Sequence, residues 1–453
     1  MQLRRIVISA AVAALVAVAV PAAVAERVVT LDGAPTSAPD RLDKVRVLQV
    51  GPAKADRVLV LLPGTSAGAA YFKPLADDLV DRLPGWQVWA VERRENLLED
   101  HSALDRAKAG DLAPPALLDY YLGWIGADAT ASPRFVAPTT EETAFAREWG
   151  MAVAIGDVRR VVRAARRGGR RVTLGGHSLG ATMAVAYATW DFEGRAGARG
   201  LDGLVLVDGG SSRGEPPTPA RARTALAELA TASPFLDLTG LGLPWSAGVF
   251  NAVGSTAALL APDEPSVLGS WPLLPANLRP PVPATNLAGY GYALDVETGP
   301  ATLALVQAHI GRLAGDGDPR GWVDDGLTTA RRAATVFSGI PGMDGTAWYH
   351  PRRLSIDAGA VNGGIANPAQ RALGVRAVHG RDLRLALYAF ETSLGAGRVL
   401  DAARDLARRS RLPARRVTLV DRGATTAHMD PIAALPGRND LLGTLVEFLR
   451  GLR

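Results

Sequence analysis

Residues 170–188 read RRVTLGGHSLGATMAVAYA and contain the pattern Gly-x-Ser-x-Gly at 176–180. A short run of β-branched and apolar residues precedes the pattern, and a run of small residues with helical character follows it. A serine on a sharp turn between a strand and a helix is exposed at the top of an α/β sheet. The N-terminus of the following helix also stabilises developing negative charge. We therefore predict that Ser178 is a nucleophile on such a turn.

Two other serines, Ser66 and Ser212, stand at the centre of the same five-residue pattern. Pro216 and Pro217 follow Ser212 and would interrupt any helix that leaves the turn. Ser66 follows an apolar run, but it comes too early in the chain, and its loop suits another role. The setting of the motif, rather than the motif alone, favours Ser178.

Short apolar runs along the rest of the chain predict strands. Most of them are continuous rather than alternating, as expected for strands buried on both faces of a parallel sheet. Helical periodicity separates several of them, for example at 158–165 and at 441–449, where Asn439 is a suitable N-cap. This alternation predicts an α/β fold with a mostly parallel, doubly wound sheet. The predicted strands are 27–31, 45–50, 58–62, 86–91, 172–174, 204–208, 385–390 and 417–420.

The first residues of the chain are typical of a secretory signal peptide. Arg4 and Arg5 form a positive region, residues 6–20 are apolar, and Ala23-Val24-Ala25 is a small-residue cleavage signal. The alternative is an uncleaved anchor, but the apolar run is short for a span of about 20 residues. We expect cleavage before Glu26, export from the cytoplasm to the medium or the cell envelope, and no stable membrane span afterwards.

The strand–helix rhythm stops between about 211 and 380, in a segment rich in Pro, Gly and Trp. A structureless loop of that length is implausible inside a domain, so we predict a large, mainly helical cap with helical pieces such as 300–313. A smaller insertion at about 97–140 is expected to join it. The predicted organisation is a signal peptide at 1–25, core at 26–210, cap at 211–380 and core at 381–453.

Composition excludes several classes of site and partner. The chain contains no cysteine, so it has neither disulfides nor thiolate metal sites. Its net charge is +5, but the arginines are spread along the chain and accompany no recognised nucleic-acid motif. With 48% hydrophobic and 21% charged residues, the chain has a globular balance. We predict no nucleic-acid partner.

With the Gly-His-Ser-Leu-Gly segment and the strands in place, the chain resembles the α/β-hydrolase superfamily, in its lipase, esterase and peptidase branches. The epoxide hydrolase and dehalogenase branches carry Asp where Ser178 stands. The resemblance implies an oxyanion hole made by the backbone N–H groups of Thr65 and Leu179. Pro63 departs from the family, which more often has His in that loop. The resemblance covers about 40–60, 80–95, 141–210 and 380–453.

The resemblance also implies the chain order serine, acid, histidine. His428 follows the last predicted strand on a loop that contains Gly and Thr, so it is the expected base. The acid normally follows the strand at 385–390, which favours Glu391. Asp208, at the end of 204–208, is the alternative, although an Asp at such a position is frequently a turn residue.

These residues predict acyl transfer to water through a covalent acyl-enzyme, a reaction that requires no metal or organic cofactor. The expected partner is a small-molecule ester or amide, and the cap favours a substrate with an apolar group. Alternatives are a capped exopeptidase, an acyltransferase and a non-catalytic binder that keeps the fold. An exopeptidase would need carboxylates for a free amine, and the candidates are Glu297, Asp324 and Asp325.

Overall fold

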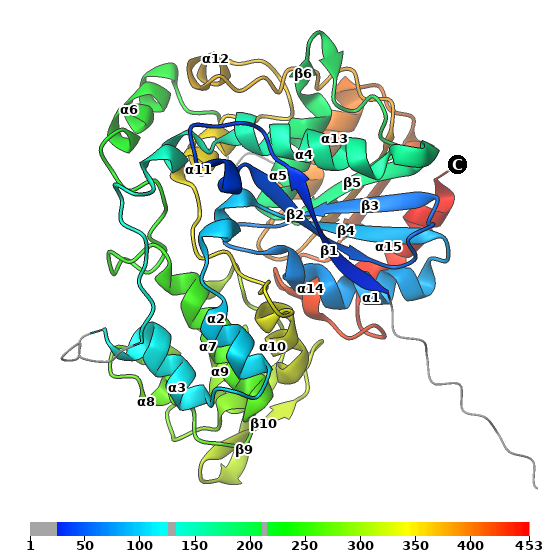
Figure 1. The fold of residues 1–453 in the computed structure, drawn as a ribbon. Coiled ribbons are helices and arrows are strands. Elements are labelled where there is room, and N and C mark those ends of the chain that lie inside the picture. Colours follow the sequence, from blue (N-terminus) through cyan, green and yellow to red (C-terminus); the bar gives the residue numbers. More distant parts are fainter. Residues whose placement is uncertain (1–24, 126–132, 211–214, 453) are drawn as a thin grey trace, which may run out of the picture.

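The computed structural model describes residues 25–125, 133–210 and 215–452 of the chain. Nearly all of the signal peptide predicted at 1–25 lies outside these ranges. The core contains an eight-stranded sheet (Figure 1). Strand β2 pairs antiparallel with both β1 and β4, and every other neighbouring pair in this sheet is parallel. In sheet order the strands are β1 (Glu26–Asp32), β2 (Lys44–Val50), β4 (Trp86–Glu92), β3 (Arg57–Leu62), β5 (Arg171–His177), β8 (Gly203–Val207), β11 (Ala386–Glu391) and β12 (Val417–Asp421).

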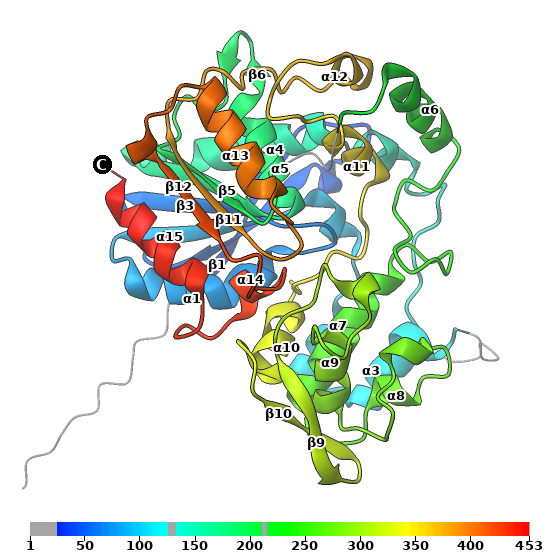
Figure 2. The same cartoon turned by 180° about the vertical axis from the view of Figure 1, so that it is seen from behind.

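Helices cover both faces of the sheet, because its central strands are apolar on both sides. In β3, for example, Val58 and Val60 face one helical layer and Leu59 and Leu61 face the other. Figures 1 and 2 show α4, α5 and α13 on the first face and α1, α14 and α15 on the second. These helices are α1 (Lys73–Arg82), α4 (Met151–Ala165), α5 (Leu179–Thr189), α13 (Arg398–Arg409), α14 (Asp430–Ala433) and α15 (Asp440–Gly451).

The sequence predictions for this core are confirmed. Every predicted strand is present with small changes at its ends, and the sheet is mostly parallel with flanking helices. The predicted N-cap is also present, since Asn439 accepts a hydrogen bond from the N–H of Leu442 at 3.0 Å. No helix within the described ranges is long and apolar enough to cross a membrane.

Two insertions extend the core at the carboxyl ends of the parallel strands. One follows β4 and the other lies between β8 and β11, and they share a core in which Trp245, Trp271 and Trp348 are buried. Figure 1 shows most of their helices as a lower lobe, whereas α11 packs beside α4, and α6 and α12 pack together at the upper edge of the view. Their elements are α2 (Ser102–Lys108), α3 (Pro114–Leu118), α6 (Pro219–Leu229), α7 (Ser246–Leu260), α8 (Val267–Ser270), α9 (Asn286–Leu294), β9 (Gly311–Gly317), β10 (Arg320–Asp324), α10 (Ala330–Ser338), α11 (Arg352–Ala358) and α12 (Pro368–Leu373).

The prediction of a helix at 300–313 is wrong. The segment contains one short 3₁₀ turn, at Ala301–Leu303, and then runs into strand β9. Carboxylates from other segments hold its backbone in place of helical carbonyls. Asp295 accepts hydrogen bonds from the N–H groups of residues 310 and 311, and Asp430 accepts one from His309. Tertiary hydrogen bonds therefore override the local apolar pattern.

Candidate active site

Ser178 lies on a strained turn between β5 and α5, as the sequence predicts for a nucleophile. Its φ of 57° and ψ of −123° are values that a residue with a side chain rarely adopts. The flanking glycines are required by close backbone packing. A Cβ on Gly180 would lie 1.9 Å from the carbonyl oxygen of Leu62, and one on Gly176 would lie 2.2 Å from the backbone of Gly180. The strain at Ser178 is thus held by contacts that only glycine allows.

The carboxylate that pairs with His428 is that of Asp208. Its Oδ2 atom lies 2.5 Å from His428 Nδ1, and both side chains are buried. Thr392 donates to the same carboxylate through its backbone N–H, at 3.0 Å, and through its hydroxyl. Burial acts to raise the pKa of Asp208, but the hydrogen bond and charge of His428, together with the Thr392 bonds, outweigh it and lower that pKa. The arrangement keeps the carboxylate ionised.

Of the two predicted acids, Asp208 and not Glu391 is hydrogen-bonded to His428 among the described residues. The Oε2 atom of Glu391 accepts a hydrogen bond from the N–H of Leu400 in α13 at 2.9 Å. Alternate residues of β11 point to opposite faces of the sheet, and Leu387 and Ala389 belong to the apolar cluster on the α13 side. Glu391 has the same parity, so its side chain lies on the α13 side of the sheet, where Oε2 is bound by Leu400.

The hydrogen bond to Asp208 determines which nitrogen of His428 carries the proton. A carboxylate can only accept, so Nδ1 carries hydrogen and Nε2 of the neutral ring keeps a free lone pair. Ser178, His428 and Asp208 all line one cavity of about 420 Å³. The other side chains of this cavity are mainly small or apolar: Leu179, Thr182, Leu305, Ser355, Ala358, Leu394, Arg398 and Val399, with Thr65 at the loop beside Ser178.

The two predicted oxyanion donors, Thr65 and Leu179, line the same cavity as Ser178. Leu179 opens α5, so its N–H is one of those that a helix leaves without an internal acceptor. The loop that carries Thr65 packs directly on the turn, since a Cβ on Gly64 would lie 3.1 Å from Ser178 Cβ. Ser66 belongs to this loop. Ser212 lies outside the described residues.

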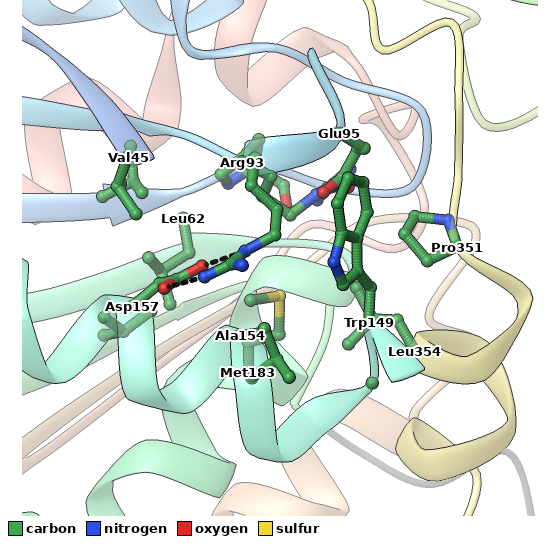
Figure 3. Close-up of a pocket in the computed structure, with 16 residues that line it drawn as sticks. Val45, Leu62, Arg93, Glu95, Trp149, Ala154, Asp157, Met183, Pro351 and Leu354 are labelled. Atoms are coloured by element: carbon green, nitrogen blue, oxygen red, sulfur yellow. Dashed lines mark hydrogen bonds and ion pairs between the residues drawn. The ribbon is translucent and has the colours of Figure 1, made fainter. Parts of the chain in front are cut away.

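Arg93 anchors the loop that carries Thr65. Its Nη1 atom donates to the carbonyl oxygens of Pro63 and Gly64 at 3.1 and 2.9 Å. Its Nε donates to Glu95 at 2.5 Å, so the buried guanidinium is paired with a carboxylate. Figure 3 shows Arg93, Glu95 and Leu62 around a small pocket, and Ser178 is not among the residues that line it. A buried guanidinium therefore holds the backbone of the loop that carries Thr65.

His177 connects this loop to the backbone of the candidate base. Its Nε2 lies 3.0 Å from the carbonyl oxygen of His428, so Nε2 carries the proton and donates. Burial is the main cause that lowers the pKa of His177, and the nearby His428 adds to it, so the ring is neutral. Nδ1 therefore accepts from the Tyr71 hydroxyl at 3.1 Å, and that hydroxyl accepts from Gly64 N–H at 3.3 Å.

Sequence reasoning missed Arg93, Tyr71 and Thr392. A signal existed for Thr392, because it follows β11 directly and β11 pairs with β8 in parallel, which brings it beside the end of β8. Arg93 directly follows a buried strand, and Glu95 comes two residues later, a pattern that favours an internal ion pair. Tyr71 carried no comparable signal, since a tyrosine in an apolar segment is most often a core residue.

The second insertion also reaches this site. The N–H of Gly68 donates to the carbonyl of Gly345 at 3.1 Å, and the N–H of Ala347 donates to the carbonyl of Ser66 at 2.9 Å. The loop at 343–348 therefore pairs with the candidate oxyanion loop. Within the described part of the chain, one group of side chains has the spacing of a metal site. It consists of Glu99, His101 and Asp344, apart from the cavity that Ser178 lines.

No family model matches the chain, and no curated protein matches it. Solved structures do. A candidate lipase from Sulfolobus solfataricus is 15% identical over 94% of this chain and 94% of its own, with a TM-score of 0.50. An epoxide hydrolase from an endophytic Streptomyces (13% identity, 95% and 96% coverage, TM-score 0.41) and a thioesterase domain from the curacin biosynthetic pathway (11%, 94% and 99%, 0.41) are also similar. The sheet order, the turn at Ser178 and this likeness agree: the chain has the α/β-hydrolase fold.

Proposed function

We propose that the protein is a serine hydrolase that cleaves a carboxylic ester with an apolar acyl group. One observation carries the proposal: Ser178, on its strained turn, lines one cavity with His428, whose Nδ1 is bound by the buried carboxylate of Asp208. A nucleophile, a base with a free Nε2 and an acid that orients the base are the parts that acyl transfer needs.

In the proposed reaction Ser178 Oγ attacks the substrate carbonyl carbon while His428 Nε2 takes the hydroxyl proton. The resulting oxyanion is held by the N–H groups of Thr65 and Leu179, and Asp208 stabilises the imidazolium. His428 then returns the proton to the leaving alcohol and the acyl-enzyme forms. Water, deprotonated by the same Nε2, attacks the acyl-enzyme, and His428 returns this proton to Ser178 Oγ as the acid leaves.

The lining of the cavity favours a substrate with an apolar acyl group. Leu305, Leu394 and Val399 contribute apolar surface, and the volume of about 420 Å³ falls in the range of small-ligand sites. None of the described residues that line it is acidic except Asp208, which is already bound to His428. Of the three carboxylates suggested for an exopeptidase, neither Glu297 nor Asp324 nor Asp325 is among the described residues that line this cavity. Asp324 accepts from Ala330 N–H, and Asp325 pairs with Arg312.

The proposal is tested by labelling the purified protein with a fluorophosphonate and by assaying p-nitrophenyl esters of increasing chain length. We expect stoichiometric labelling and ester turnover, both lost in Ser178→Ala. Wild type that is not labelled, or Ser178→Ala that is labelled equally, contradicts the serine mechanism. Turnover of aminoacyl amides but not of esters would favour an exopeptidase, and transfer to added alcohols in preference to water would favour an acyltransferase.

We also propose that the protein is exported and acts outside the cytoplasm. The predicted cleavage point lies directly before β1, so removal of 1–25 leaves every strand of the sheet intact. N-terminal sequencing of protein recovered from the medium or the cell envelope should begin at Glu26. Recovery of the full-length chain from the cytoplasm alone would contradict this proposal.

A further inference from the structure

Three ionisable side chains meet at the junction of the two insertions, away from the cavity that Ser178 lines. Glu99 and His101 lie at the start of α2, in the first insertion, and Asp344 lies in the loop after α10, in the second. The exposed fractions of the side chains are 0% for Glu99, 9% for His101 and 1% for Asp344. The group is therefore closed off from solvent.

Two atoms in this group are buried without a hydrogen bond. His101 Nε2 lies 3.2 Å from Glu99 Oε2 and 3.5 Å from Asp344 Oδ2, yet neither His101 Nε2 nor Glu99 Oε2 forms a hydrogen bond with a described residue. A buried polar atom without a partner is rare in native proteins and is often explained by an ion or a water. One possible ligand atom from each of the three side chains lies within 4.8 Å of the other two.

The remaining atoms of the two carboxylates are already bound, which fixes their orientation. Glu99 Oε1 accepts from the backbone N–H of Trp348 at 2.8 Å. Asp344 Oδ1 accepts from the N–H and hydroxyl of Thr346 at 2.7 and 2.8 Å, and Asp344 Oδ2 accepts from the indole N–H of Trp348 at 3.0 Å. Hydrogen bonds of this kind are how proteins orient the side chains that ligate a metal.

We propose that Glu99, His101 and Asp344 bind one Zn²⁺ ion through Oε2, Nε2 and Oδ2. Zinc bonds to histidine and carboxylate are about 2.0–2.1 Å long, so neighbouring ligand atoms of a tetrahedral site lie about 3.3 Å apart. The two distances from His101 Nε2, 3.2 and 3.5 Å, match that edge. An imidazole ligand favours zinc over magnesium and calcium, which prefer oxygen alone.

The charges of the site suit a divalent cation with a neutral imidazole. Two carboxylates compensate one Zn²⁺ ion, and water can occupy the fourth position. Two further charged groups lie nearby and are already engaged. Glu92 pairs with Arg46, and Lys108 donates to the backbone carbonyls of Ser338 and Ile340.

The bound ion would join the two insertions at the loop that supports the candidate oxyanion donors. Asp344 belongs to 343–348, which pairs with residues 66–68 through Gly345 and Ala347. Zinc would therefore stabilise the fold and hold that loop in position, with no part in the bond-breaking step. The inference does not rest on the proposed hydrolase activity, since binding is measured without turnover.

Metal content and thermal unfolding of the full-length protein test the proposal. The protein is treated with a chelator, dialysed against Zn²⁺, freed of excess metal and analysed by elemental analysis. We expect one equivalent of Zn²⁺ per chain and a Tm that rises by a few degrees over the chelated protein. No retained zinc, or retention of Mg²⁺ or Ca²⁺ in preference to zinc, would overturn the assignment and leave the group as an ion pair of protonated His101 with its carboxylates.

Variants identify the ligands. His101→Gln and Glu99→Gln should each lose the retained zinc. If His101→Gln does not fold, Glu99→Gln alone tests the assignment of the ligands. The matched control is His379→Gln, because His379 also contacts two carboxylates, Asp382 and Asp191, but through separate nitrogens. It should retain one equivalent, as should Ser178→Ala. Equal retention in His101→Gln and wild type would contradict the proposal, whatever the esterase assays give.

Discussion

His177 donates a hydrogen bond from Nε2 to the main-chain carbonyl of His428, 3.0 Å away, and so fixes the backbone position of the candidate base. His177→Ala would leave this carbonyl and the Tyr71 hydroxyl without their buried partner, at a cost of about 1–3 kcal/mol. We expect kcat on a p-nitrophenyl ester to fall about tenfold to hundredfold, with a small change in KM. Unchanged kcat with a lowered Tm would mean that His177 serves stability alone.

Tyr71→Phe is the matched control for this prediction. It removes one hydroxyl that binds His177 and Gly64, but it keeps the bond between His177 and the backbone of His428. We expect a smaller loss of kcat than in His177→Ala. A larger loss would indicate that the oxyanion loop depends on Tyr71 more than His428 depends on His177.

The two candidate acids are separated by paired substitutions. Asp208→Asn keeps the shape of the side chain but offers His428 an amide, so we expect kcat to fall by about 10³–10⁴, as removal of the acid does in other triads. Glu391→Gln can still accept from Leu400, and kcat should stay within about threefold of wild type, given that its contact lies in α13. The opposite order of effects would restore Glu391 as the acid.

The volume of the cavity sets the longest acyl chain that it accepts. Leu394 lines it, and Leu394→Trp should fill part of the space. We expect kcat/KM for octanoate esters to fall at least tenfold more than for acetate esters, since the short chain does not reach the new ring. Equal losses on both substrates would mean that the acyl group binds elsewhere. Arg398→Gln changes another residue of the same cavity without added bulk and is the control variant.

A pH-dependent contact ties the second insertion to the loop of His428. His309 Nδ1 lies 2.6 Å from Asp430 Oδ2. The hydrogen bond to Asp430 is the main cause that raises the pKa of His309, and burial opposes it. A raised pKa means that the contact adds stability fully below the unfolded pKa of about 6.5 and loses it as the pH rises through the folded value.

We therefore expect the Tm of His309→Gln to lie below that of wild type at pH 6, with a difference that shrinks toward pH 9. Differential scanning calorimetry across this range measures the effect. The charges of Asp295 and Glu297 act on His309 in the same direction, so the comparison is made at constant ionic strength. A difference that grows with pH would contradict the assigned direction.

The sheet could be predicted from the sequence because its strands are short, continuous apolar runs. Runs such as 58–62 and 204–208 are buried on both faces of the sheet. Ser178 could be predicted for a related reason. The turn needs glycines at 176 and 180, and both the strand before it and the helix after it are visible in the sequence.

The acid and the anchor of the oxyanion loop depend on contacts between distant segments. Asp208 and Glu391 each follow a strand, and only the direction of the side chain separates them. That direction depends on the pleat of β11 and on a positive φ of 44° at Asp208, neither of which leaves a local pattern. Arg93 looks like a surface charge in the sequence, because its burial depends on carbonyls about 30 positions earlier in the chain.

The pairing of 343–348 with the loop of Thr65 bears on how the molecule could be re-engineered. A lid that only covers a pocket can be trimmed or exchanged between relatives, as one exchanges a module. Here the inserted segment contributes backbone hydrogen bonds, through Gly345 and Ala347, to the loop that would stabilise the oxyanion. A chimera that replaces this insertion must reproduce those two bonds. Otherwise the replacement that changes substrate access also removes the support of the loop that carries Thr65.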